Sequence, residues 1–134
     1  MRTIDAVASI IETAGIAVAG ITLFAGSDAD LPRISGALIT LVESGGGPPV
    51  GIHNSRALRQ PSIQLTVRGD IYTEITTMLE LAYIACGGGE VPLANFSVGD
   101  AFFLWMHPAQ EPFQLLNDAQ GRVRLAFNID FLRR

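Results

Sequence analysis

Two stretches of the chain repeat apolar side chains at helical spacing. Residues 3–14 and 71–86 each carry an apolar stripe with hydroxyl and acidic side chains on the opposite face. The stripes consist of Ile4, Val7, Ala8, Ile11 and Ala14 in the first stretch, and of Ile71, Ile75, Met78, Leu79, Ala82 and Cys86 in the second. Thr3 and Asp70 are the expected N-caps, and glycines follow both stretches. The spacing predicts two amphipathic helices.

Other stretches have the pattern of strands. Residues 62–68 and 122–131 alternate apolar and polar side chains, as in a sheet with one buried face. Residues 37–43 and 101–106 are continuously apolar, which is typical of strands covered on both faces. Shorter strands are predicted at 21–24 and 113–116. Residues 117–121 have hairpin chemistry, with Gly121 available for a positive φ.

The stretch between the first two long strands has no period. Gly45 to Gly47 and two prolines should stop regular structure, so residues 44–60 are predicted to form an irregular loop, and residues 50–60 are expected to be mobile or ordered only by a partner. A phosphate-binding loop would need glycines leading into a helix, usually with a lysine. Prolines follow these glycines, and the chain has no lysine, so a connector is the favoured interpretation.

The order of these elements predicts the fold class. Helices and strands do not alternate regularly, which disfavours a doubly wound nucleotide-binding fold. We expect one α+β domain over residues 1–134, with a mixed, mainly antiparallel sheet and two helices packed on one face. The other face would carry the polar rows Gln64, Thr66 and Arg68, and Arg122, Arg124 and Asn128.

Composition narrows the class of protein. Of the 134 residues, 49% are hydrophobic and 16% charged, which is the opposite of a disordered chain. The net charge of −4, without a basic run, argues against a dedicated nucleic-acid-binding domain. Residues 14–25 are uncharged but too short to span a bilayer, so no membrane association is expected. A single cysteine indicates a reducing compartment such as the cytoplasm.

No catalytic or metal-binding pattern emerges. Cys86 lies on an apolar stripe, where a small buried side chain is the favoured role. His53 and His107 fall in loops without further ligands at a metal-binding spacing, and we interpret them as surface histidines. Asp28, Asp30 and Asp118 have the setting of turn residues that bond the local backbone. We therefore predict no enzyme, cofactor or metal.

The outward-facing arginines are more informative. Arg68, Arg122 and Arg124 could belong to an ordinary solvated sheet face or to a subunit or partner interface, where arginine is enriched. The low charge of the chain favours oligomerisation. The predicted interface residues are Arg68, Arg122, Arg124, Gln64, Arg56, Arg59 and His53.

Three segments together resemble a known family. They are ESGGGPP at 43–49, PSIQLTVRG at 61–69 with the helix after it, and the Asp-x-x-Gly-Arg turn leading into the strand around Asn128. Their order and spacing resemble those of the minor capsid and tail-terminator proteins of long-tailed bacteriophages. The resemblance covers roughly residues 20–134. The residues at 14–25 and 50–60 depart from that pattern, in places where partner contacts would lie.

The resemblance implies a structural role in the virion. Such proteins form a ring, typically of six subunits, at the head-proximal end of the tail; the ring stops tube growth and joins tail to head. It implies as partners further copies of the chain, the tail tube protein and a head-completion or connector protein. The chain would reside in the host cytoplasm during assembly. Two alternatives remain: another neck or head-completion protein, or an α+β small-molecule enzyme or binding module.

Overall fold

A computed structural model describes residues 1–26, 36–50, 58–90 and 93–134. Its elements, in chain order, are α1 (Thr3–Thr13), β1 (Leu23–Ala25), β2 (Leu38–Val50), β3 (Leu58–Gly69), α2 (Tyr72–Tyr83), the π-helical turn η2 (Ile84–Gly88), β4 (Leu93–Val98), β5 (Ala101–Pro108), β6 (Phe113–Leu115) and β7 (Val123–Arg133). Both predicted helices are present, each within two or three residues of its expected ends.

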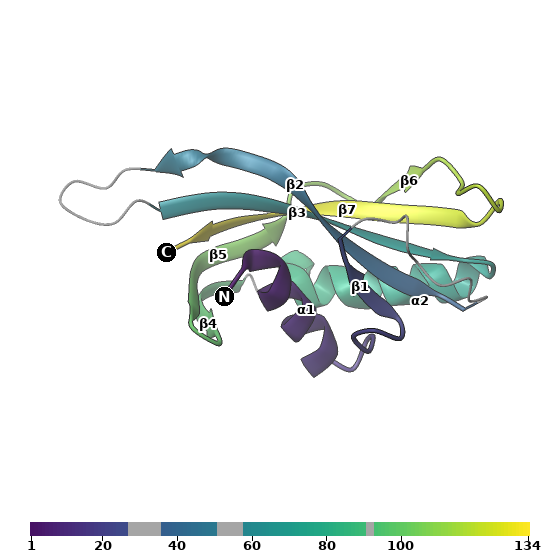
Figure 1. The fold of residues 1–134 in the computed structure, drawn as a ribbon, viewed down its shortest axis with the longest axis horizontal. Coiled ribbons are helices and arrows are strands. Elements are labelled where there is room, and N and C mark those ends of the chain that lie inside the picture. Colours follow the sequence, from purple (N-terminus) through teal and green to yellow (C-terminus); the bar gives the residue numbers. More distant parts are fainter. Residues whose placement is uncertain (27–35, 51–57, 91–92) are drawn as a thin grey trace.

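The strands form one mixed sheet in the order β1-β2-β3-β7-β5-β4, with β6 also paired to β7. The β1–β2 pair is parallel and the other pairs are antiparallel. Figure 1 shows α1 and α2 lying on the same side of the curved sheet. The predicted class, a mainly antiparallel α+β sheet with two helices on one face, is therefore confirmed.

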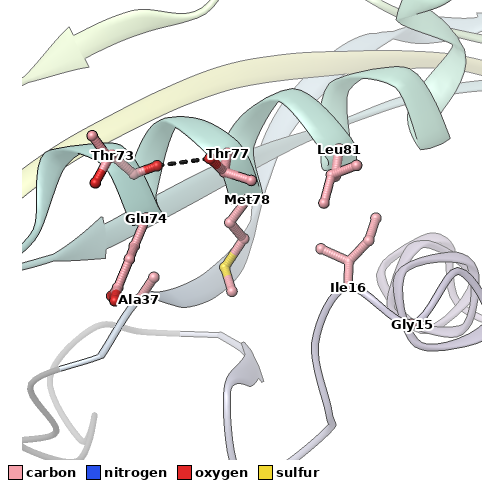
Figure 2. A pocket seen from close by; sticks show the side chains of 8 residues that line it. All are labelled: Gly15, Ile16, Ala37, Thr73, Glu74, Thr77, Met78 and Leu81. Atoms are coloured by element: carbon pink, nitrogen blue, oxygen red, sulfur yellow. Dashed lines mark hydrogen bonds between the residues drawn. The ribbon is translucent and has the colours of Figure 1, made fainter.

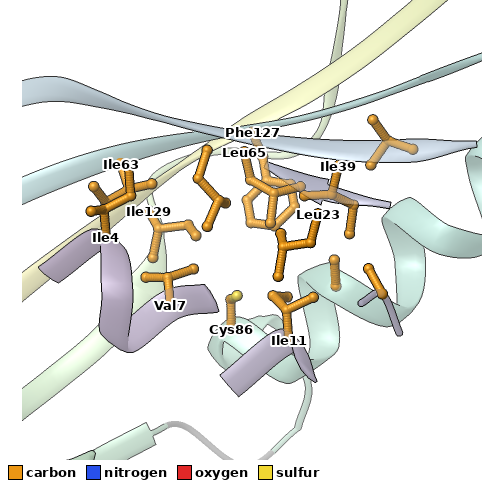
Figure 3. Close-up of a cluster of buried hydrophobic side chains, with 14 of the residues drawn as sticks. Ile4, Val7, Ile11, Leu23, Ile39, Ile63, Leu65, Cys86, Phe127 and Ile129 are labelled. Atoms are coloured by element: carbon orange, nitrogen blue, oxygen red, sulfur yellow. The ribbon is translucent and has the colours of Figure 1, made fainter. Parts of the chain in front are cut away.

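The hydrophobic core fills the space between the sheet and the helices. Figure 3 shows Ile4, Val7 and Ile11 of α1 pointing toward Leu65 and Phe127 of the central strands. Cys86 completes this cluster and is fully buried, as the apolar stripe predicted. Burial raises the pKa of the Cys86 thiol to about 12, because a thiolate would lose its hydration there. The cysteine is therefore part of the packing.

Both helix starts differ from the prediction. Thr3 is the first residue of α1, and its hydroxyl oxygen accepts a hydrogen bond from Arg133 Nη1 at 3.1 Å. Ile71 occupies the N-cap position of α2, so Asp70 lies one residue too early to cap it. Neither helix has a side-chain cap. The helices depend on their buried faces, which is the usual source of helix stability in a folded domain.

The predicted loop at 44–60 is wrong where the structure describes it. Strands β2 and β3 stay paired from Leu38–Arg68 to Val50–Leu58, with register shifts after Glu43 and Gly47. Gly46 has φ +112°, and a side chain there would collide with the Gln60 carbonyl oxygen. The glycines therefore bend the strand instead of ending it. Prolines are tolerated because this part of β2 is an edge. Residues 51–57 lie outside the described residues.

The paired ends of strands β2 and β3 project beyond the body of the molecule as an arm (Figure 1). We call β2 from Glu43 to Val50, together with β3 from Leu58 to Pro61, the β2–β3 arm. The C-terminal end of β7 runs alongside the β3 part of the arm to within one residue of its start, since Arg59 pairs in register with Arg133. The start of α2 lies at the opposite end of the long axis (Figure 1). The molecule thus has two chemically different ends.

The last third contains one strand more than predicted. Strand β4 pairs with β5, and three of its six residues, Leu93, Phe96 and Val98, are partly buried while the others are exposed. Strand β5 has a register shift between Phe103 and Trp105, so Phe103 and Met106 both enter the core. Trp105 stacks on the exposed ring of His107, with centroids 4.5 Å apart. The expectation that both faces of residues 101–106 are covered thus fails at Trp105, and His107, which was expected in a loop, belongs to this strand.

Candidate interaction surfaces

The predicted polar face exists, but part of it is buried. Arg68 of β3 and Arg124 of β7 are register partners on the sheet face opposite the helices. Arg68 and Arg122 are each only 8% exposed, whereas Arg124 is partly exposed. A cross-strand pair of arginines is destabilised by repulsion unless acceptors lie nearby. The turn between β6 and β7 supplies those acceptors.

Asp118 in that turn forms ion pairs with two of these arginines. Its Oδ2 accepts a hydrogen bond from Arg122 Nε at 2.8 Å and lies 3.7 Å from Arg68 Nη1. Its Oδ1 accepts the main-chain N–H groups of Gln120 and Arg122, each at 2.9 Å. Arg124 Nε donates to the Leu116 carbonyl oxygen at 2.7 Å. We call Arg68, Arg122, Arg124 and Asp118 the turn cluster.

The ionised form of Asp118 is favoured in the folded protein. Burial alone would raise the pKa of this carboxyl, but the hydrogen bonds from the Arg122 and Gln120 amides and from the Arg122 guanidinium outweigh it. The pKa therefore lies below its ordinary value. The backbone bonds match the turn role expected for Asp118, and Gly121 has the positive φ expected of it, +76°. The link from Asp118 to Arg68, which is distant in sequence, was not expected.

Gln64 continues the same face toward the arm. It lies opposite Asn128 and both are partly exposed. The Asn128 Oδ1 atom is buried and has no hydrogen-bond partner among the described residues. Farther along, Ser62 Oγ donates to Asp130 Oδ1 at 2.8 Å and contacts the Ile129 carbonyl oxygen at 3.1 Å. The face thus changes from an arginine cluster with one carboxylate to a strip of uncharged side chains that ends at Asp130.

Arg59 does not join this face. It lies on the helix side of the sheet, where a cavity of about 550 Å³ opens beneath the arm. Arg2, Arg59 and Arg133 line the cavity together with one carboxylate, Glu43. Arg59 is exposed, whereas Arg133 is 4% exposed. We call this space the arginine cavity.

Arg133 is a site residue that the sequence analysis missed. Its Nη1 donates to the Met1 carbonyl oxygen at 2.8 Å and to Thr3 Oγ1 at 3.1 Å, and its Nε donates to Arg134 O at 3.1 Å. The guanidinium also lies 5.5 Å from the centroid of the Phe103 ring. The alternation of β7, continued two residues past Phe131, would have placed Arg133 on the buried side.

A second hollow lies between α2 and the segment after α1. Figure 2 shows Met78 and Leu81 of α2 facing Ile16 across it, with Glu74 at one end. Its volume is about 500 Å³, and its walls are mostly apolar. Leu81 of α2, Ile84 of η2, and Val18 and Ile21 after α1 are each more than half exposed. We call this hollow the α2 groove.

The remaining sequence predictions concern the two histidines, Arg56, metal ligands and membrane-spanning helices. His53 and Arg56 lie outside the described residues. His107 is exposed, as expected of a surface histidine. Among residues 1–26, 36–50, 58–90 and 93–134, no three His, Cys, Asp or Glu side chains gather as metal ligands. No helix in the same part of the chain is long and apolar enough to cross a membrane.

The chain was compared with known proteins. The sequence matches no protein-family profile and no curated protein. The structure, however, is similar to a solved chain from the virion of a native gene transfer agent particle. The two chains share a fold. The TM-score is 0.66, and the match covers 98% of this chain and 93% of that chain. The sequence identity is 11%, so the likeness concerns the fold and leaves individual residue roles open.

Proposed function

We propose that this chain is a structural component of a virion, and that it acts as a tail terminator. Copies of the chain would form a ring on the head-proximal end of a tail tube, stop its growth and present the surface that joins it to the head. The observation that carries the proposal is the whole-chain likeness to a chain from a gene transfer agent virion. The sequence resemblance to tail terminators points in the same direction, from different features.

The shape of the monomer suits a ring. A ring needs two different surfaces on each copy, because each subunit contacts its neighbours head to tail and closes at a fixed rotation. The arm and the α2 end supply two such surfaces at opposite ends of the long axis (Figure 1). The exposed part of the turn cluster, around Arg124 and near Gln64, would face the lumen or a subunit junction. The arm, with Arg59 and the sequence carrying His53 and Arg56, would contact a neighbour or the tube.

The proposed role is tested by polymerising the cognate tail tube protein with and without this chain. A tail terminator stops elongation when it is added, and electron micrographs then show extra density at one end of each tube. Tubes that elongate unchanged and keep bare ends contradict the role.

A different neck position would give a different phenotype in the assembled particle. Loss of a terminator leaves overlong or unjoined tails, whereas loss of a head-completion protein leaves filled heads that leak. The likeness to a virion chain is compatible with both positions. The phenotype of a deletion distinguishes them. An enzyme or small-molecule binding module would instead be monomeric and would shift in melting temperature with a metabolite panel.

A further inference from the structure

The arginine cavity carries more positive than negative charge, because Arg59 and Arg133 share its wall with one carboxylate, Glu43. Arg59 and Arg133 are register partners on β3 and β7, so two like charges lie directly opposite each other. Arg2, the third arginine of the wall, is 3.1 Å from Asp5, which neutralises it. Within the described part of the chain, neither Arg59 nor Arg133 forms an ion pair. The cavity therefore offers the exposed Arg59 to whatever enters it, with the 4% exposed Arg133 in its wall.

Burying the Arg133 guanidinium beside Arg59 costs the isolated chain free energy. Burial and the nearby Arg59 lower the pKa of the Arg133 guanidinium, because both disfavour its charge. The main-chain and hydroxyl oxygens around Arg133 satisfy its N–H groups but bring no side-chain carboxylate to it. A buried cation is stabilised most when a hydrogen-bonded anion accompanies it. The cavity is thus suited to an entering carboxylate.

The opposite end of the molecule offers carboxylates. Asp70 precedes α2, and Glu74 lies in its first turn; both are exposed. From residue 69 to residue 121 the sequence has no arginine or lysine, so no basic side chain of this stretch competes for them. Leu81 and Ile84 continue the exposed surface of α2 with apolar side chains, beside the α2 groove. On the helix side of the sheet this end is acidic and apolar, whereas the turn cluster lies on the opposite sheet face of the same end.

The structure points to a junction between copies, and we propose that Asp70 and Glu74 of one copy enter the arginine cavity of the next. The two surfaces differ and lie at opposite ends of the long axis, so the contact is head to tail and can be repeated around a ring (Figure 1). The carboxylates would separate Arg59 from Arg133, and the apolar part of α2 would pack beneath the arm. The inference deepens the proposed terminator role and rests on it for ring closure.

Two charge reversals test the junction. Glu74→Arg puts a positive charge on the α2 end, and Arg59→Glu puts a negative charge in the cavity, while Arg133 is left in place. Each variant alone confronts like charges at every junction, and we expect about tenfold weaker self-association for each. In an equimolar mixture, the altered α2 end meets the altered cavity, and the native α2 end meets the native cavity. Alternating copies should therefore restore association to about the wild-type level.

Glu90→Arg is the matched control, because Glu90 is also exposed and acidic but lies after η2. Self-association is measured by sedimentation velocity at low salt up to millimolar concentration, and the same samples are scored for ring density on tail tubes. Thermal unfolding of each variant confirms that it is folded. Adding inorganic phosphate shows whether a free anion competes for the cavity, and competition that weakens association supports the proposal.

The outcomes separate the junction from the proposed function. Loss in both single variants, rescue in the mixture and no loss with Glu90→Arg support the junction. Variants that self-associate as the wild type does overturn the junction, whether or not tubes are capped. No rescue in the mixture, or a wild-type chain monomeric both in solution and on tubes, also overturns it. A rescued assembly that leaves tubes growing supports the junction and contradicts the terminator role.

Discussion

Strands β3 and β7 carry two cross-strand arginine pairs with opposite surroundings. At one end Arg68 lies opposite Arg124, and at the other Arg59 lies opposite Arg133. The first pair is covered by a turn that brings Asp118 and the Leu116 carbonyl oxygen to it. The second pair lines an open cavity, and within the described residues no ion pair reaches it. The same local pattern is thus contacted by a carboxylate of its own chain at one end, and in the proposed junction it meets the carboxylates of a partner at the other.

The difference shows why an arginine row alone does not identify an interface. Arg68 and Arg122 belong to the predicted interface, yet their shortest described contacts are internal, and both are 8% exposed. Arg59 was grouped with them but lies on the opposite face of the sheet, in the arginine cavity. A charge whose partner is supplied by its own chain stabilises the fold. A charge without one is available for recognition.

The largest expected effect is at Asp118. Replacement of Asp118 by alanine removes the carboxylate from Arg68 and Arg122, and leaves two poorly exposed guanidinium groups without their anion. We expect the free energy of unfolding to fall by about 2 kcal/mol. Chemical denaturation measures the loss. Asp5→Ala is the control, because the Asp5–Arg2 pair is exposed and should contribute little. Equal losses in both variants contradict the assigned role of the turn cluster.

A second prediction concerns the exposed arginine of that end. Arg124→Glu should weaken ring assembly while changing the free energy of unfolding by less than about 1 kcal/mol, because Arg124 is partly exposed. Ring formation on tail tubes and thermal unfolding of the same sample measure the two effects. If the variant forms rings and caps tubes normally, Arg124 has no role in the assembly.

The turn cluster should also make stability depend on pH. The pKa of Asp118 is lower in the folded than in the unfolded chain, so the folded state is stabilised above the unfolded pKa of about 4. That stabilisation disappears as the pH falls through the folded pKa. Asp118→Asn should therefore lose less stability than the wild type between neutral pH and about pH 3. Parallel pH profiles for the two chains would contradict this.

The smallest effect on stability is expected in the arginine cavity. Arg59→Gln removes the repulsion of Arg133 without removing an ion pair of the described residues. The isolated chain should be stabilised by a few tenths of a kcal/mol, roughly the size of a cross-strand pair. Arg68→Gln, the matched change in the turn cluster, should destabilise the isolated chain. Thermal unfolding of both variants in the same buffer compares them, and destabilisation of equal size by both would remove the distinction between the ends.

The sequence predicted the elements whose patterns are set by burial. Both amphipathic helices, the alternating strands and the Gly121 turn appear where periodicity placed them. The arm was missed because Gly46 and the prolines normally interrupt a strand, whereas an edge strand accommodates them through a bulge. Strand β4 was missed because its six residues are half exposed and lack a continuous apolar face.

The interaction surfaces were harder to predict than the fold. Sequence spacing placed Gln64 and Arg68 on one face correctly, but it did not show that the turn holding Asp118 folds back over Arg68. It also gave no sign that Arg59 and Arg133 become neighbours across two strands. Both are long-range consequences of the pairing of β3 with β7. Their chemistry follows only once the register is known.

The account depends most on copies of this chain meeting end to end on a tube. Electron cryo-microscopy of tail tubes incubated with the protein tests this directly. We predict a closed ring at one end of each tube, in which the arm end of every subunit contacts the α2 end of its neighbour. Tubes with bare ends, or bound subunits that do not touch one another, would contradict the account.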